Sequence, residues 1–270
     1  MAGTSKYIQV GNEKLHCLQF GRGKELLIAF HGYGNDAYIF EPFVKYLGEK
    51  FTIICVDLPH HGESKWTANT PLQKKDLLDF INTLKSEFEI NKVSLLGYSM
   101  GGRVCLTIIE LMPGSIDKVL LIAPDGMIFN PLYYFVTQTL LGKKMFRGLI
   151  ANPRRYLRFI DWLKERRWLD SSRHKFVINY IGTKDSRAFL LKVWPDMSNI
   201  TPDIKKLKSA IRQYKIPVFI FIGMYDKIIP AKHAHRFSKD LSSVKLYILE
   251  KGHRVFDHET LPDMAECLLA

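Results

Sequence analysis

The sequence predicts an α/β fold in which a mostly parallel central sheet is flanked by helices and carries an inserted all-helical cap. Short apolar runs recur along the chain and are continuous rather than alternating, which is typical of strands buried on both faces. Most runs are separated by stretches long enough for a helix, which favours parallel strands with helices on both faces of the sheet. One long middle segment contains no such run.

The strands follow one another in chain order. Residues 6–10 and 14–20 flank the polar turn Gly11, Asn12 and Glu13, and this pattern predicts a hairpin. The remaining strands are predicted at LLIAF (26–30), FTIICVD (51–57), VSLLG (93–97), VLLIA (119–123), VFIFIG (218–223) and KLYILE (245–250).

Helix signals fill several gaps between these strands. Thr70 and Pro71 predict an N-cap followed by proline at the first position of a helix that extends to residue 88. Residues 103–112, RVCLTIIELM, are apolar nearly all round and end before Pro113. Such a helix is expected to be buried in the centre of the fold.

The segment 125–208 interrupts this rhythm. It contains helix-like stretches without a convincing strand, and Asn152 with Pro153 predicts the start of one of its helices. We therefore predict a core formed by residues 1–124 and 209–270, with 125–208 inserted as the helical cap.

The positive charge of the chain is concentrated in this segment. Residues 125–208 contain 17 Lys and Arg against 7 Asp and Glu, so they supply +10 of the formal net charge of +12. Two interpretations stay open: a solvated face of amphipathic helices, or attraction of the cap to an anionic membrane surface or to acidic acyl substrates. Nucleic-acid binding is not expected, because the basic residues interleave with aromatic ones and no recognition motif is present.

The composition indicates a cytoplasmic protein. No apolar run approaches the roughly 20 residues that span a bilayer, and the first 17 residues lack the apolar stretch of a secretory signal. The four cysteines are far apart and form no C-x-x-C pair, which is typical of reduced thiols; they are Cys17, Cys55, Cys105 and Cys267.

The stretch GYSMG at 97–101 has the G-x-S-x-G spacing, in which a serine sits at the tip of a strand-to-helix turn. Ser99 stands where a predicted buried strand meets a predicted buried helix. A serine hydroxyl is a poor nucleophile at neutral pH, so acyl transfer needs a histidine base and a carboxylate that orients it.

The order of residues along the chain identifies candidates for both partners. In serine hydrolases with this turn, the serine comes first, then the acid, then the histidine. Asp226 follows the strand at 218–223, and His253 follows the strand at 245–250. Because the C-terminal ends of parallel strands share one edge of a sheet, we expect these side chains to meet Ser99 there.

The charge that develops on a carbonyl oxygen needs backbone N–H donors. Gly32 and Gly34 permit a sharp turn after the strand at 26–30, so the N–H of Tyr33 is one candidate. The N–H of Met100 is the second, because it opens a helix whose dipole favours negative charge.

Five stretches carry a resemblance to a known family: HGYG (31–34), DLPHHGES (57–64), GYSMGG (97–102), GMYDKIIP (223–230) and KGHRVFDHE (251–259). On these stretches the chain resembles the α/β-hydrolase superfamily, as a serine hydrolase with a helical cap over its active site. The resemblance implies a nucleophile, an acid, a base and two oxyanion donors, which are Ser99, Asp226, His253 and the N–H groups of Tyr33 and Met100. His60 departs from the pattern, because many relatives have glycine at this position.

Rivals for the acid and the base remain open. Asp125 follows the strand at 119–123, a position from which some branches of the family draw their acid, although Asp226 is favoured. His258 competes with His253, which is favoured because it follows a strand directly after a glycine.

No metal and no cofactor are expected. The pairs His60 with His61 and His233 with His235 are too few and too poorly spaced for a zinc site, which combines three or four ligands. Glycine-rich loops that cradle phosphates are absent. His31 is expected to form structural hydrogen bonds.

The sequence thus predicts a cofactor-free serine hydrolase that cleaves a carboxylic ester or thioester of a small to medium acyl substrate through an acyl-enzyme. The same residues could serve a carbon–carbon bond or amide hydrolase, since a fold does not determine its substrate. From a different class comes the alternative of a non-catalytic ligand-binding protein on this scaffold.

Overall fold

The computed structural model describes residues 3–67, 70–166 and 181–270. Contacts between residues divide the chain into two compact units. The first unit combines Met1–Phe129 with Asn199–Ala270, and the second is Asn130–Ser198. The cap was predicted over residues 125–208.

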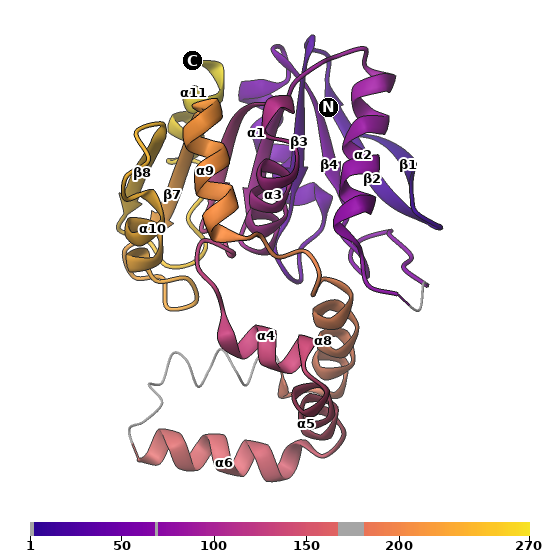
Figure 1. Cartoon of the computed structure of the whole chain (residues 1–270), viewed down its shortest axis with the longest axis vertical. Helices are drawn as coiled ribbons and strands as arrows, with labels where there is room; N and C mark the ends of the chain where they lie inside the picture. Colours follow the sequence, from indigo (N-terminus) through magenta and orange to yellow (C-terminus); the bar gives the residue numbers. More distant parts are fainter. Residues whose placement is uncertain (1–2, 68–69, 167–180) are drawn as a thin grey trace. The chain divides into compact units, whose positions relative to one another are not determined.

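The first unit is built on an eight-stranded sheet with the order β1-β2-β4-β3-β5-β6-β7-β8 (Figure 1). The strands are β1 (Thr4–Val10), β2 (Glu13–Gly21), β3 (Glu25–Phe30), β4 (Phe51–Val56), β5 (Val93–Tyr98), β6 (Ile116–Ile122), β7 (Val218–Gly223) and β8 (Val244–Leu249). The β1–β2 and β2–β4 pairs are antiparallel, and every other neighbouring pair is parallel. The predicted mostly parallel sheet is confirmed.

The continuous apolar runs form the strands at the centre of this sheet. Every residue of β4 and β5 is buried, as is every residue of β3 after Glu25. A strand covered on both faces gains from apolar side chains at successive positions, which explains the absence of alternation.

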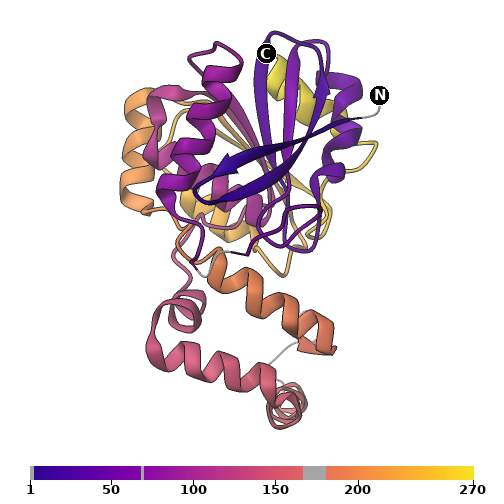
Figure 2. The ribbon, with the colours of Figure 1, turned by 90° about the vertical axis from the view of Figure 1, so that its right-hand side faces the viewer.

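Helices cover both faces of the sheet. They are α1 (Glu41–Leu47), α2 (Lys74–Glu87), α3 (Met100–Leu111), α9 (Ile204–Tyr214), α10 (Ala231–Ser238) and α11 (Leu261–Leu269). Figure 2 shows α1 and α11 on one face, and α2, α3 and α9 on the other. The predicted central helix is α3, in which the residues from Met100 to Ile109 are all buried.

The start of α2 differs from the prediction. The helix begins at Lys74 rather than at Pro71, because Gln73 and Asp76 form a capping box. The backbone N–H of Gln73 donates to Asp76 Oδ2 at 2.8 Å. This reciprocal pair satisfies N–H groups that the helix itself leaves without a partner, and Thr70 therefore lies outside the helix.

The described part of the second unit consists of helices: α4 (Pro131–Gln138), α5 (Leu140–Ala151), α6 (Pro153–Glu165) and α8 (Lys184–Asp196). Trp194 joins three of them, because Phe146 stacks on its indole with ring centroids 5.5 Å apart and Tyr133 donates from its hydroxyl to the Trp194 carbonyl at 3.1 Å. Asn152 precedes α6 as predicted, but its side chain forms no capping hydrogen bond. Among the described residues, no helix has both the length and the apolar character needed to cross a membrane.

Candidate active site

Ser99 occupies a sharp turn between β5 and α3. Its backbone angles are φ 50° and ψ −114°, a region that residues with a side chain rarely adopt. Three backbone hydrogen bonds of 2.9 Å hold the turn: Ser99 N–H donates to the Ile122 carbonyl, and the Ser99 carbonyl accepts from the N–H groups of Gly102 and Asp125. The surrounding sheet thus maintains a strained conformation, as is common at functional sites.

The glycines on either side of Ser99 are required by lack of space. A Cβ atom on Gly101 would overlap the carbonyl oxygen of Phe30, and one on Gly97 would come within 2.8 Å of Cys105 Sγ. Any larger residue would separate α3 from β3 at position 101, or α3 from β5 at position 97. The spacing of the motif therefore has a steric cause.

The structure brings three predicted residues into one hydrogen-bonded series. His253 Nε2 lies 2.9 Å from Ser99 Oγ, and His253 Nδ1 lies 2.7 Å from Asp226 Oδ2. Asp226 follows β7 and His253 follows β8, and these two strands are parallel neighbours. The series therefore forms at the C-terminal edge of the sheet, where the prediction placed it.

Hydrogen bonds to Asp226 orient the imidazole. The carboxylate is fully buried, and its Oδ1 accepts from the backbone N–H groups of Ile228 at 2.8 Å and Ile229 at 2.9 Å. Its Oδ2 therefore faces His253. Because a carboxylate only accepts hydrogen bonds, the proton of a neutral His253 lies on Nδ1, and Nε2 is free to accept from the Ser99 hydroxyl.

Aromatic rings pack against this imidazole. The Tyr98 ring lies 5.5 Å from that of His253, and Phe256 packs edge-on against Tyr98 at 5.1 Å. Burial, with a smaller contribution from the charge of Asp226, raises the pKa of Tyr98 to about 12, so its hydroxyl stays neutral. These contacts restrict the rotation of His253.

The rival residues take other positions. Asp125 Oδ2 lies 3.5 Å from Nη1 of the buried Arg103, and its Oδ1 accepts from Gly126 N–H at 2.7 Å. His258 is exposed. Within the described residues, neither side chain hydrogen-bonds to His253 or to Ser99.

The candidate oxyanion donors lie at the same edge of the sheet. Tyr33 belongs to the turn after β3, in which Asn35 N–H donates to the Gly32 carbonyl at 3.1 Å. β3 is the parallel neighbour of β5, so this turn starts beside the one that carries Ser99. Met100 is the first residue of α3, so its N–H has no carbonyl partner within the helix.

His31 ties the turn after β3 to the loop after β4. Its Nδ1 donates to the Gly32 carbonyl at 2.7 Å, and its Nε2 accepts from Leu58 N–H at 3.0 Å. Burial, together with the neighbouring His61, lowers the pKa of His31 to about 3 and keeps it neutral. In the same loop His60, which departs from the family pattern, has φ 68°, a conformation that favours glycine.

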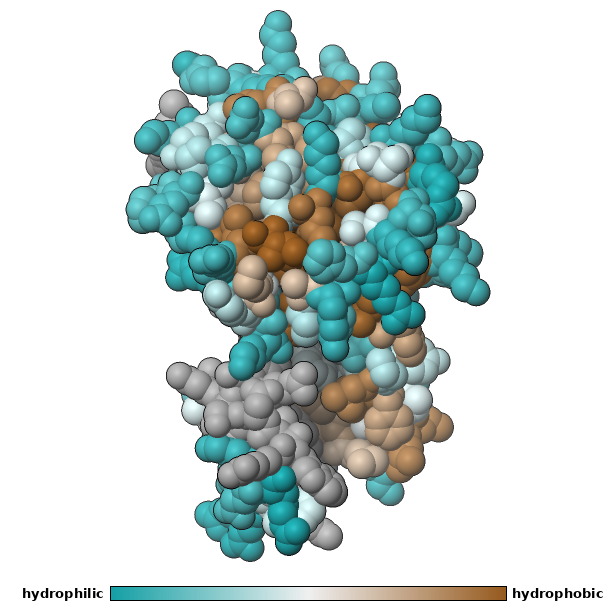
Figure 3. Space-filling model, turned by 90° about the vertical axis from the view of Figure 1, so that its left-hand side faces the viewer, coloured by the Kyte–Doolittle hydropathy of each residue, from teal (hydrophilic) through white to brown (hydrophobic). Residues whose placement is uncertain are grey.

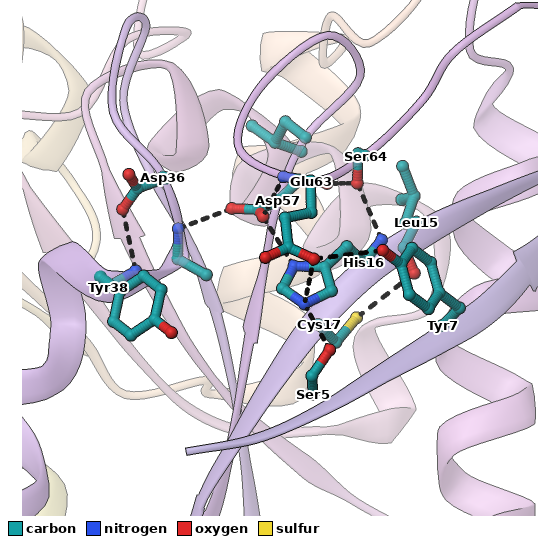
Figure 4. Close-up of polar contacts among 12 residues, drawn as sticks. Ser5, Tyr7, Leu15, His16, Cys17, Asp36, Tyr38, Asp57, Glu63 and Ser64 are labelled. Atoms are coloured by element: carbon teal, nitrogen blue, oxygen red, sulfur yellow. Dashed lines mark hydrogen bonds and ion pairs between the residues drawn. The ribbon is translucent and has the colours of Figure 1, made fainter. Parts of the chain in front are cut away.

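Asp57 is a buried anchor that the sequence analysis did not single out (Figure 4). Its Oδ1 accepts from Ala37 N–H at 2.7 Å, and its Oδ2 accepts from Glu63 N–H at 2.9 Å. His16 Nδ1 lies 2.7 Å from the same Oδ2. One carboxylate thus holds the segment after the Tyr33 turn, the loop after β4 and strand β2. Its position directly after a buried strand was the available signal.

The same cluster contains a second series of serine, histidine and aspartate. Ser5 Oγ lies 2.8 Å from His16 Nε2, as Figure 4 shows. However, Ser5 is in the extended edge strand β1, whereas Ser99 has positive φ and stands before the N-terminus of α3. Hydrogen-bond distances alone therefore do not distinguish a nucleophilic serine here. The strained turn and the adjacent helix do.

Across the three described ranges, no group of three or more His, Cys, Asp and Glu side chains is arranged to hold a metal ion. His233 and His235 both lie on α10. Burial lowers the pKa of His233 and thus favours its neutral form.

Comparisons with known proteins identify the fold family of the chain. The sequence model of one family, the alpha/beta hydrolase fold, matches residues 25–258. The chain is 25% identical over 243 residues to the pimeloyl-[acyl-carrier protein] methyl ester esterase of Legionella pneumophila (strain Corby), covering 88% of this chain and 90% of that protein.

Solved structures with the same architecture are more distant in sequence. The 2-hydroxy-6-oxo-6-phenylhexa-2,4-dienoate hydrolase of Rhodococcus sp. strain RHA1 has a TM-score of 0.67 and 21% identity, with 99% of each chain covered. Naproxen esterase from Bacillus subtilis has a TM-score of 0.63 and 16% identity, with 99% of this chain and 92% of that chain covered. At these identities the likeness establishes the fold alone.

Proposed function

Because the chain belongs to the α/β-hydrolase fold family, we propose that it is a serine hydrolase that cleaves a carboxylic ester or thioester of a small to medium acyl substrate. The observation that carries the proposal is the series in which His253 lies 2.9 Å from Ser99 Oγ and 2.7 Å from Asp226 Oδ2. The strained turn at Ser99 adds support, because it distinguishes this serine from Ser5, which forms a similar hydrogen-bonded series with His16 and Asp57.

In this proposal Ser99 Oγ attacks the carbonyl carbon while its proton passes to His253 Nε2. Asp226 holds the imidazole in orientation and stabilises the imidazolium that forms. His253 then donates this proton to the departing alcohol or thiol, which leaves an acyl group on Ser99. A water molecule next loses a proton to His253 and attacks the acyl group, and the carboxylic acid departs as Ser99 regains its hydrogen.

The backbone N–H groups of Tyr33 and Met100 bind the negative oxygen of each tetrahedral intermediate. Removing one such donor typically costs about 100-fold to 1000-fold in rate. The fit of the Tyr33 turn is maintained by His31 and Asp57, which hydrogen-bond to the backbone on either side of it. All these groups belong to the protein, so the proposed reaction requires no cofactor.

An ester is favoured over the alternative substrates by the curated relative at 25% identity, which is a methyl ester esterase. Cleavage of a carbon–carbon or amide bond by the same residues is the alternative within the enzyme class. A ligand-binding protein without activity is the alternative from outside it.

A panel of aryl esters of graded acyl length, with acyl-CoA thioesters, tests the proposal. We expect Ser99→Ala to lose activity on the order of a millionfold. Ser5→Ala is the matched control, because it removes a hydroxyl from the similar series at His16, and we expect it to retain wild-type rates. A folded wild-type chain that cleaves nothing in the panel, or a Ser99→Ala variant that stays active, would refute the proposal.

A further inference from the structure

The second unit exposes large apolar side chains on α4 and α5. Leu140 is 89% exposed, Leu132 66%, Leu141 62% and Met145 47%. Figure 3 shows hydrophobic side chains gathered over these two helices of the unit. Exposed apolar groups that gather in one place commonly mark a binding surface.

The helical geometry of α5 arranges these side chains in rows. Gly142 and Phe146, four residues apart, are buried against the other helices. Leu141 and Met145 form an apolar row on the exposed side by the same spacing. One exposed side of α5 is therefore apolar.

A basic row lies on the other side of the buried row from the apolar one. Lys143 and Arg147 are four residues apart and exposed, and Lys144 projects between them and the row of Leu141. Within the described part of the chain, none of these three cations forms an ion pair. Lys74 on α2, in contrast, pairs with Glu110 at 2.9 Å.

The surrounding sequence adds to this charge. Residues 130–198 contain 14 Lys and Arg against 5 Asp and Glu, so the second unit carries most of the chain's excess of positive charge. A surface with this excess attracts anions over about 8 Å at physiological salt and is screened at higher salt.

We propose that α4 and α5 form a docking surface for anionic phospholipid membranes. A helix that combines an exposed apolar row with a basic row lies in the plane of a bilayer, with leucines among the acyl chains and cations among the headgroups. An acidic protein would neutralise the cations, but it would not by itself cover Leu140 and Leu141. The proposal concerns binding and does not depend on hydrolysis.

Vesicle flotation with the full-length chain tests the docking surface. Phosphatidylcholine vesicles with and without phosphatidylglycerol are compared at low and high salt, with Ser99→Ala protein so that hydrolysis does not alter the lipid. We expect binding to the vesicles with phosphatidylglycerol, and loss of it at high salt. Because each cation near such a surface contributes about fivefold, the triple variant K143Q/K144Q/R147Q should bind on the order of 100-fold more weakly.

Two further variants separate a specific surface from general charge. L140S/L141S should weaken binding by on the order of tenfold or more while it keeps every charge. The matched control K205Q/K206Q/R212Q removes two lysines and one arginine from the exposed side of α9, and should bind like the wild type.

Several results would overturn the docking surface. They are absence of binding to anionic vesicles, an equal loss in the α9 control, and binding to an acidic acyl-carrier protein in place of vesicles. Retention of the wild-type thermal midpoint by each variant shows that it is folded. Hydrolysis of a soluble aryl ester by the same variants on a Ser99 background tests the proposed function separately, and we expect it to be unchanged.

Discussion

Under the proposed function, we predict that Asp226→Asn lowers kcat/KM by about 10⁴-fold, the size of effect that the equivalent change has in a Ser-His-Asp protease. The structure determines which way the new amide points. Oδ1 of Asp226 accepts from two backbone N–H groups, at 2.8 and 2.9 Å, so the asparagine oxygen must occupy this position. The amide nitrogen, which donates, then faces His253 Nδ1.

This orientation reverses the role of the imidazole. His253 Nδ1 must accept from the amide, so its proton moves to Nε2, which now donates to Ser99 Oγ and cannot take a proton from it. The lost base and the lost stabilisation of the imidazolium correspond to about 5.4 kcal/mol for a 10⁴-fold effect.

The assay is kcat/KM for an aryl ester at neutral pH, with the thermal midpoint as the measure of folding. Asp125→Asn is the matched control, because Asp125 also follows a strand of the sheet but contacts Arg103 instead of His253. We expect this control to remain within about tenfold of the wild type. If Asp226→Asn keeps more than a tenth of the activity, or if the control loses as much, Asp226 does not orient a catalytic His253.

Three other predictions concern stability. Asp57→Asn should lower the free energy of unfolding in urea by about 3 kcal/mol, because an amide cannot accept all three hydrogen bonds of this buried carboxylate. The control Asp79→Asn, on the exposed side of α2, should change this free energy by under about 0.5 kcal/mol. Equal effects of the two substitutions would contradict the prediction. Gly101→Ala should prevent stable folding, because its Cβ would overlap a backbone carbonyl. The control Gly34→Ala, at φ 75° in open space, should lower the free energy of unfolding by about 1 kcal/mol in the same assay. A stably folded Gly101→Ala variant would contradict the steric requirement. Burial lowers the pKa of His31 to about 3, whereas a histidine in the unfolded chain titrates near 6.5. His31 should therefore leave the free energy of unfolding unchanged above pH 6.5 and lower it by about 1.4 kcal/mol per pH unit below. A free energy of unfolding that stays level from pH 7 to about 5 would contradict this.

Much of the fold follows from local patterns in the sequence. The strands were recognisable because the sheet is buried on both faces, so their apolar runs are continuous, as in β4 and β5. Ser99 was recognisable because the glycines at 97 and 101 are sterically required, and such a requirement leaves a mark in the sequence itself. Asp226 and His253 could be predicted because parallel strands bring their C-terminal ends to one edge of the sheet.

Other features depend on contacts that no local pattern records. The local sequence does not distinguish His16 from the other residues of its strand. Only the pairing of β2 with β4 brings it to Asp57, which is 41 positions away. The start of α2 was predicted at Pro71 because proline is common at first helical positions, but the capping box of Gln73 and Asp76 prevails. The predicted role of Tyr33 rests on the orientation of a backbone group, which the side chains of the sequence do not encode.

The proposed function requires that Ser99, and no other serine, acts as the nucleophile. Labelling of the folded protein with a fluorophosphonate, followed by mass mapping of the modified peptide, tests it most directly. We predict one label on Ser99, which is absent from Ser99→Ala and retained in Ser5→Ala. A label on Ser5, or no label on a chain that is folded, would show that Ser99 is not the nucleophile.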